Sequence, residues 1–392
     1  MSLRVWLRRR GGSRLVVYNR VMKYWVKILS VWLALKVIFY LPFFSGVKLL
    51  WPGLSFDLLW KNFDGAYFLA VADSWYSPDR LNALWAWLDR PATYFPAHFP
   101  LLPGFIWVFS KMGLSLPWAG VLVTNGFELL MMWVWVRLYQ VVYKKLPPWW
   151  LVMGIVLLSP RMWVVNSVIS PEALFITLTL LAFFFWEKEK YLLAVFHAVL
   201  AFWTKSPAFF IFAAFGLWLW LVEHKASLWL TIKDKRSWLV IFGGLLAFIG
   251  LNWFFYLKTG NFWAYFQSGD NMHLFFPPLQ VFNPKQVWVG SFWLEDVVLL
   301  LSLYSLLLIR SWNKFKEKPF WVFSALFLSS LFFVAHRDIS RYALPVVPVL
   351  ILMNADGFKG LEMDKRRNRV IVAIYIVLTF FYGWNFINGN HP

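Results

Sequence analysis

The sequence predicts an all-α protein that crosses a membrane about eleven times. Of the 392 residues, 60% are hydrophobic, 21% are aromatic and only 15% are charged, which lies outside the range of soluble globular proteins. Apolar runs recur along the chain between charged, proline and glycine residues. The 28 Trp residues fit the lipid–water boundary, where an indole ring is buried while its N–H stays hydrated.

Charge and composition narrow the functional classes. The 38 Lys and Arg residues exceed the 19 Asp and Glu residues, for a net charge of +19. In so apolar a chain, we expect the membrane surface rather than nucleic acid to balance that charge. Without Cys, the chain cannot form a disulfide, a thiolate metal site or a cysteine nucleophile. It also lacks nucleotide-binding glycine motifs and metal-spaced His clusters, so no cofactor is expected. No residue is assigned to a metal, although the pattern leaves room for a divalent ion.

The chain begins with a basic tail and a first span. Residues 1–23 contain several Arg and Lys residues but no acid, which predicts a cytoplasmic tail. Residues 24–44 are apolar and long enough to cross about 30 Å of hydrocarbon. A cleaved signal peptide would have a shorter apolar run, followed by a small-residue cleavage site. We therefore take 24–44 as the first transmembrane helix.

Further apolar runs follow, and the loop charges orient them. The runs are 99–143, 149–168, 171–186, 191–204, 206–222, 237–256, 294–310, 320–335, 341–355 and 369–387. The first is broken near Gly113 and Pro117, and we take it as one net crossing. With that parity most loop Lys and Arg residues are cytoplasmic, whereas two crossings there would place most of them outside. Residues 1–392 then form a single membrane domain with a cytoplasmic N-terminus.

Two long loops on the outer side, 46–98 and 257–293, and the nearby helix junctions hold most of the side chains capable of chemistry. We therefore expect an active site on the extracytoplasmic or lumenal face. Within 46–98, Ser77-Pro78-Asp79 is typical of a helix start, and the apolar residues that follow repeat at helical spacing. This pattern predicts a helix lying in the lipid headgroup region, with Asp79 as a surface charge.

Asp64 follows the first span closely, and its position admits two interpretations. It could cap a helix over residues 65–76. Alternatively it could act as a general base, because partial burial beside the bilayer would raise the pKa of its carboxyl group toward a useful range. Asp73 lies further along on another face of the same helix, so it could pair with Asp64 only if that helix broke.

Five short segments, taken in order, resemble a known family. They are Phe63-Asp64-Gly65-Ala66-Tyr67-Phe68, Phe95-Pro96-Ala97-His98-Phe99-Pro100, Ser170-Pro171-Glu172-Ala173-Leu174-Phe175, Thr204-Lys205-Ser206-Pro207-Ala208 and His336-Arg337-Asp338-Ile339-Ser340-Arg341-Tyr342-Ala343-Leu344-Pro345. Together they look like the PIG-V-like mannosyltransferases of the GT-C glycosyltransferase superfamily. Phe63 stands where that family has Trp, and Lys205 stands where it has Arg.

The resemblance implies an inverting transfer of a hexose, mannose in that family, from a polyprenyl-phosphate donor to a lipid-linked or glycan acceptor, within membrane lipids and with Asp64 as the catalytic base. Inversion needs a carboxylate to take the acceptor proton and a cation to hold the leaving phosphate, but no covalent nucleophile. Arginine suits bidentate phosphate contacts and lysine acts as a point charge. The candidates for binding the donor phosphate are His98, Lys205, Arg337 and Arg341.

Other polar residues keep more than one interpretation. The family match makes Glu172 a second acid or acceptor ligand, with Asp73 as another candidate, but Glu172 could simply oppose a helix dipole in a first turn. Arg337 and Arg341 could instead pair locally with Asp338. The intramembrane charges Lys36 and Glu128 could pair with each other, or Glu128 could belong to a cavity.

A polytopic transporter or a lipid-linked sugar flippase is the alternative function. Such proteins also carry many spans and intramembrane charges. They usually show internal repeats with paired broken helices, which this sequence does not display, and their charges tend to lie at mid-membrane rather than in one outer loop. The transferase is therefore the preferred hypothesis.

Overall fold

The computed structural model describes residues 14–45, 53–62, 64–269, 272–289, 293–358 and 366–389. The fold is all-α, as predicted. Within those ranges no strand forms, and Leu274 and Val334 make an isolated antiparallel bridge. Parts of the predicted tail and of both outer loops lie outside the described residues, namely 1–13, 46–52, Phe63, 270–271 and 290–292.

The first half of the chain runs from the initial long helix to the region after the first outer loop. Its elements are α2 (Arg14–Ser45), α3 (Phe56–Lys61), α4 (Gly65–Ser74), α5 (Pro78–Leu84), η1 (Ala86–Leu88), η2 (Ala92–Ala97), α6 (Leu101–Lys111), α7 (Leu116–Tyr143), α8 (Trp149–Leu157), α9 (Pro160–Val165), α10 (Glu172–Trp186) and α11 (Tyr191–Phe202).

The second half is also built of helices. Its elements are η3 (Ser206–Ala208), α12 (Phe209–Leu217), the π-helical turn η4 (Trp218–Glu223), α13 (Leu228–Lys233), α14 (Lys235–Thr259), α15 (Ala264–Gln267), η5 (Gln280–Phe282), α16 (Trp293–Phe315), α17 (Pro319–Leu331), α18 (Ile339–Tyr342), η6 (Leu344–Val346), α19 (Val347–Met353) and α20 (Arg366–Gly389).

Five helical segments are long and apolar enough to cross a bilayer, so the chain is a membrane protein. They are Val21–Phe44 in α2, α7, Ser206–Glu223 through η3 to η4, α14 and α20. Other apolar helices, including α10 and α11, are shorter. The predicted break in 99–143 is confirmed: α6 and α7 are separate helices, and between them Gly113 has a φ of 101°, a left-handed conformation that favours glycine.

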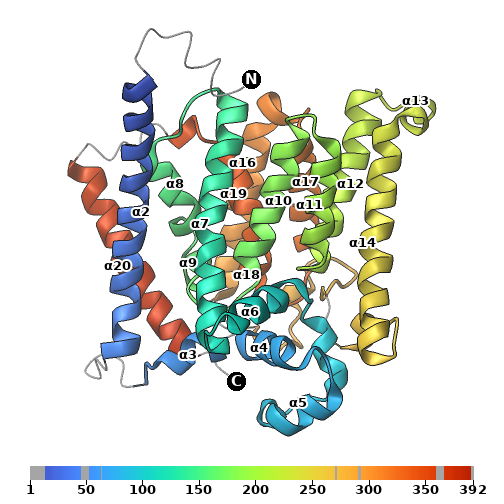
Figure 1. Ribbon diagram of the computed structural model, residues 1–392. Coiled ribbons are helices and arrows are strands. Elements are labelled where there is room, and N and C mark those ends of the chain that lie inside the picture. The colour runs from blue at the N-terminus through green and yellow to red at the C-terminus, as the bar shows by residue number, and fades with distance from the viewer. Residues whose placement is uncertain are drawn as a thin grey trace.

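The long helices run side by side, and the short helices of the first outer loop gather at one end of this bundle (Figure 1). In that view α3, α4 and α5 lie at the bottom, whereas α13 and the start of α2 lie at the top. Near the centre, α10 is apolar on all sides and is buried against α7 and α11. A helix so enclosed holds its first residue, Glu172, in a fixed place.

A buried ion pair joins α2 to α7. Nζ of Lys36 lies 2.9 Å from Oε2 of Glu128, and both side chains are almost fully buried. The same ammonium group donates to the carbonyl oxygen of Asn166 and to Oγ of Ser167, each at 2.9 Å. Of the two interpretations that the sequence left open for these charges, the structure shows the pairing of Lys36 with Glu128. Because Asn166 and Ser167 precede α10, the pair also anchors the turn that leads to Glu172.

Candidate active site

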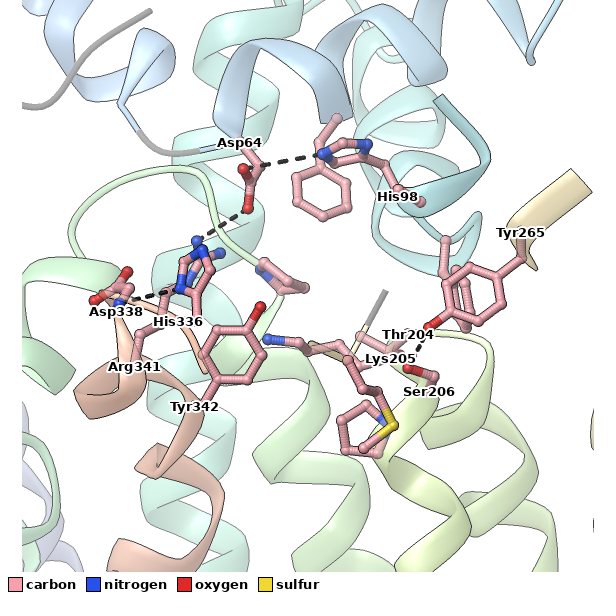
Figure 2. Close-up of a pocket in the computed structure, with 16 residues that line it drawn as sticks. Asp64, His98, Thr204, Lys205, Ser206, Tyr265, His336, Asp338, Arg341 and Tyr342 are labelled. Carbon is pink, nitrogen blue, oxygen red and sulfur yellow. Dashed lines mark hydrogen bonds and ion pairs between the residues drawn. The ribbon is translucent and has the colours of Figure 1, made fainter. Parts of the chain in front are cut away.

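A cavity of about 150 Å³ lies at the end of the bundle where α4 and η2 meet the ends of several longer helices (Figure 2). Six separate stretches of the sequence line it, namely 64–68, 97–99, Pro171, 204–207, Tyr265 with Met272, and 336–342. Its charged and ionisable lining residues are Asp64, His98, Lys205, His336, Asp338 and Arg341. The structure therefore brings four of the predicted site residues into one cavity.

Asp64 occupies the N-cap position of α4, but its side chain makes no capping hydrogen bond. Oδ2 instead accepts a hydrogen bond of 2.9 Å from Nη1 of Arg341, and Oδ1 lies 4.0 Å from Nε2 of His98. The preceding corner is tight, because a Cβ on Gly65 would collide with the carbonyl oxygen of Trp60. The lack of a side chain at Gly65 thus lets α3 turn sharply into α4 with Asp64 at the corner, facing the cavity.

The electrostatic setting of Asp64 differs from the sequence-based expectation. Burial alone would raise the pKa of this carboxyl group, but the charge of Arg341 and the nearby His98 ring outweigh burial. They hold the pKa of Asp64 well below its usual range. The expected upward shift was wrong, because the sequence could not reveal that a guanidinium from the other end of the chain would lie against this carboxylate.

Glu172 binds two cations, Arg341 and Lys205. Its Oε1 accepts from Nε of Arg341 at 2.7 Å and from Nζ of Lys205 at 2.9 Å. The Glu172 side chain is 1% exposed, and its Oε2 has no hydrogen-bond partner among the described residues. Arg341 therefore links two carboxylates, and these two acids and two bases balance in charge. The pairing of Glu172 with both cations goes beyond the simple helix-dipole interpretation.

Lys205 enters the site at the junction between α11 and η3. Its side chain is 25% exposed and is paired with Glu172. This ion pair offsets the free-energy cost of placing an ammonium group between apolar helices. The next residue, Ser206, accepts a hydrogen bond of 2.9 Å from the hydroxyl group of Tyr265 in α15. The segment that follows α14 thus contacts the same junction through Tyr265.

His98 lies next to Asp64 and is surrounded by aromatic rings. Its ring centroid is 5.0 Å from those of both Tyr67 and Phe68, and 5.4 Å from that of Tyr94. The residue is 3% exposed, and its Nδ1 has no hydrogen-bond partner among the described residues. This packing fixes the ring so that Nε2 faces Asp64.

The segment before α18 supplies a second histidine. The backbone N–H of Asp338 donates to Nδ1 of His336 at 3.0 Å, so a neutral His336 ring carries its proton on Nε2. The Asp338 carboxylate pairs with Nη2 of Arg161 at 2.6 Å, and Nε of Arg161 lies 3.3 Å from Oγ of Ser340. Asp338 is therefore held by α9, and Arg341 is directed toward Asp64 and Glu172.

Besides Glu172, which contacts Lys205 and Arg341, two further predicted site residues do not line the cavity. Arg337 is exposed and does not line it. Asp73 pairs with Nη2 of Arg80 at 2.6 Å and accepts from the indole of Trp85 at 3.1 Å, which ties α4 to α5. A hydrogen-bonded corner explains Asp73 better than a role as second acid. We therefore leave both residues out of the candidate site.

The lining residues Tyr265, Met272 and Tyr342 were not predicted, and neither was Arg161, which does not line the cavity but pairs with Asp338. The long loop 257–293 was a signal for the first two, and the Arg-Tyr pair at 341–342 was a signal for Tyr342. No periodic pattern singles out Arg161. In the part of the chain that the structure describes, no group of three or more His, Asp or Glu residues is placed to hold a metal ion.

Comparison of the chain with models of known protein families finds no match, and comparison with curated proteins finds no significantly similar protein. The family resemblance therefore rests on the short motifs themselves. Chemically, the cavity combines two carboxyl groups, two cations and two histidines. Such a set can accept a proton and hold an anionic group.

Proposed function

We propose that this protein is an inverting membrane glycosyltransferase. It would move a hexose, mannose by the family resemblance, from a polyprenyl-phosphate donor to a lipid-linked or glycan acceptor. The observation that carries the proposal is the meeting of Asp64 with Arg341 and Lys205 in one cavity at the end of an apolar bundle. A carboxylate and two phosphate-binding cations are the groups that this reaction needs.

In the proposed reaction the acceptor hydroxyl oxygen attacks the anomeric carbon from the face opposite the phosphate. The bond between that carbon and the phosphate oxygen breaks as the new glycosidic bond forms, and the bonding electrons leave with the polyprenyl phosphate. Asp64 takes the proton from the acceptor hydroxyl group. Arg341 and Lys205 stabilise the negative charge on the leaving phosphate.

Arg341 couples the two halves of this mechanism. In the structure it binds Asp64, which lowers the proton affinity of the proposed base. An incoming phosphate offers Arg341 a competing anion, and a guanidinium that turns toward phosphate releases Asp64. The carboxylate would then become a stronger base only after the donor has bound. Glu172 would keep Arg341 and Lys205 in place during this exchange, because it contacts both cations.

His336 extends the donor site beyond the residues predicted from the sequence. It lines the cavity, and the backbone N–H of Asp338 fixes its Nδ1 as an acceptor. The proton of a neutral ring is then on Nε2, which can donate to a phosphate oxygen. We assign His336 to the phosphate site together with His98, Lys205 and Arg341.

We propose that the cavity lies on the non-cytoplasmic face. We also propose that shorter apolar helices cross the membrane together with the five long ones, for about eleven crossings in all. The support is the distribution of charge: Lys144, Lys145, Lys188 and the basic stretch 225–236 follow helix ends remote from the cavity. At that remote end, Lys318 before α17 pairs with Glu187 after α10 at 2.7 Å. Cytoplasmic loops are enriched in Lys and Arg, which favours this orientation.

A donor panel tests the proposal. Purified protein would be reconstituted in vesicles with radiolabelled polyprenyl-phosphate sugars and a lipid and glycan extract as acceptor source. We expect label from one donor, mannose first, to appear in a new glycoside of inverted configuration. Donor that moves between leaflets without entering a product would instead support the flippase alternative. A panel in which no donor is consumed or moved would contradict both.

A further inference from the structure

A second cavity, of about 200 Å³, lies between α2, α8 and α20, away from the candidate active site. Its walls are almost entirely apolar side chains. They include Val31 and Leu35 of α2, Met153 and Leu157 of α8, and Ile371 and Val372 of α20. None of these residues takes part in the proposed reaction.

The cavity arises because α2 and α20 diverge. The two helices pack closely at one level, where the rings of Phe39 and Trp384 stack at 6.1 Å and the Trp384 indole donates to the Phe39 carbonyl oxygen at 2.9 Å. The cavity-lining residues Val31 and Val372 lie two or more turns away from that level. Both helices are mostly unburied along their spans, so this wedge lies at the lipid-facing side of the bundle.

Cations mark one end of the wedge. Lys27 lies one helical turn before Val31, and its Nζ is 4.2 Å from the centroid of the Trp149 ring, which also lines the cavity. Arg367 lies one turn before Ile371 and is exposed. Among the described residues, no carboxylate lies within ion-pair distance of Lys27 or Arg367, in contrast to the paired cations of the active site.

These features point to one kind of ligand. An apolar cavity of this size is a poor place for water, but an acyl chain would supply the missing contacts. Lys and Arg residues that have no carboxylate partner in the described parts of the chain can attract an anionic lipid headgroup at the end of such a cavity. We infer that the wedge binds an anionic phospholipid, with an acyl chain between α2, α8 and α20 and its phosphate at Lys27 and Arg367. This site is independent of the proposed transferase activity.

Native mass spectrometry of the full chain in mild detergent tests the inference. Phosphatidylglycerol and phosphatidylcholine with identical acyl chains would be titrated separately. We expect the wild-type protein to retain one phosphatidylglycerol more tightly than phosphatidylcholine. Lys27→Gln should weaken phosphatidylglycerol binding about fivefold, the factor for about 1 kcal/mol per basic residue near an anionic lipid surface. Lys225→Gln is the matched control, because Lys225 is exposed next to α13.

A cavity-filling variant separates the chain contact from the charge contact. Val372→Trp should reduce retention of both lipids, and its melting temperature would show that the fold persists. Equal retention of the two lipids by wild-type protein would overturn the inference. So would identical effects of Lys27→Gln and Lys225→Gln, or unchanged retention in a folded Val372→Trp variant.

Discussion

Arg341 and Asp64 are in contact although 277 positions separate them: Nη1 of Arg341 lies 2.9 Å from Oδ2 of Asp64. The same guanidinium contacts Glu172 at 2.7 Å, so one side chain connects α4, α10 and α18. The proposed base is thereby oriented and kept ionised. Its activation then depends on a competing anion, which makes Arg341 the residue that would couple donor binding to catalysis.

The lowered pKa of Asp64 predicts a defined dependence of stability on pH. A folded-state pKa below the unfolded value stabilises the fold above the unfolded pKa, and that contribution is lost as the pH falls through the folded pKa. The difference in melting temperature between wild type and Asp64→Asn should be constant above about pH 5 and shrink below about pH 4. Thermal melts across this range measure it. A difference that changes between about pH 4 and neutral pH would indicate a raised pKa instead.

Arg341 should matter more for stability than Lys205. Arg341→Gln leaves Asp64 and Glu172 without their shared cation, and breaking a buried ion pair costs about 3–5 kcal/mol. Lys205 is partly exposed and has one carboxylate partner in the structure, so Lys205→Gln should cost less. Unfolding free energies in one detergent provide the comparison. Equal losses would show that Arg341 is not the central contact.

Lys205 should act chiefly on the donor. We expect Lys205→Ala to raise the KM for the polyprenyl-phosphate sugar more than that for the acceptor, because a lost point charge weakens phosphate binding. Steady-state kinetics with each substrate varied in turn gives the two values. A matched control is Lys61→Ala. Nζ of Lys61 lies 3.7 Å from Oδ2 of Asp57, and neither residue lines the cavity. Similar increases for both substrates would argue against a phosphate contact.

Two substitutions of His336 separate its two ring nitrogens. In His336→Asn the amide oxygen can replace Nδ1 as acceptor for the Asp338 N–H, but the donor at the Nε2 position is lost. In His336→Gln the amide nitrogen can approach the Nε2 position. We expect weaker donor binding in His336→Asn and partial recovery in His336→Gln, measured by titration with polyprenyl phosphate. The reverse order would assign His336 a purely structural role at Asp338.

The sequence predicts the all-α fold and several helix boundaries but not the contacts between helices. Charged residues, proline and glycine end the apolar runs, which is why the break at Gly113 and the start of α10 at Glu172 could be anticipated. An isolated charge inside a bilayer needs a partner, so the pairing of Lys36 with Glu128 was one of the two interpretations that the sequence left open. Helix ends of this kind depend on neighbouring residues and on the membrane alone, whereas the choice of a distant partner does not.

The features that the sequence could not predict depend on contacts between residues that are brought together only by the fold. Asp73 is close to Asp64 in the chain, yet the turn after α4, with Trp75 at a φ of 49°, brings Arg80 to Asp73. Arg337 and Arg341 look equivalent in the sequence, but Arg337 precedes α18 and is exposed, whereas Arg341 lies in α18 and lines the cavity. The prediction that the pKa of Asp64 is raised was wrong for the same reason, because the shift depends on Arg341, which only the tertiary packing brings to Asp64.

Sugar transfer by Asp64→Asn tests the central claim most directly. Wild type, Asp64→Asn and the control Asp79→Asn, a substitution at an exposed first-turn acid of α5, would be compared for donor binding and for transfer. A lost general base lowers the rate by about 10²–10⁴-fold, so Asp64→Asn should bind donor and lose transfer, while Asp79→Asn stays near wild type. Transfer at the wild-type rate by Asp64→Asn would contradict the proposed role of this carboxylate.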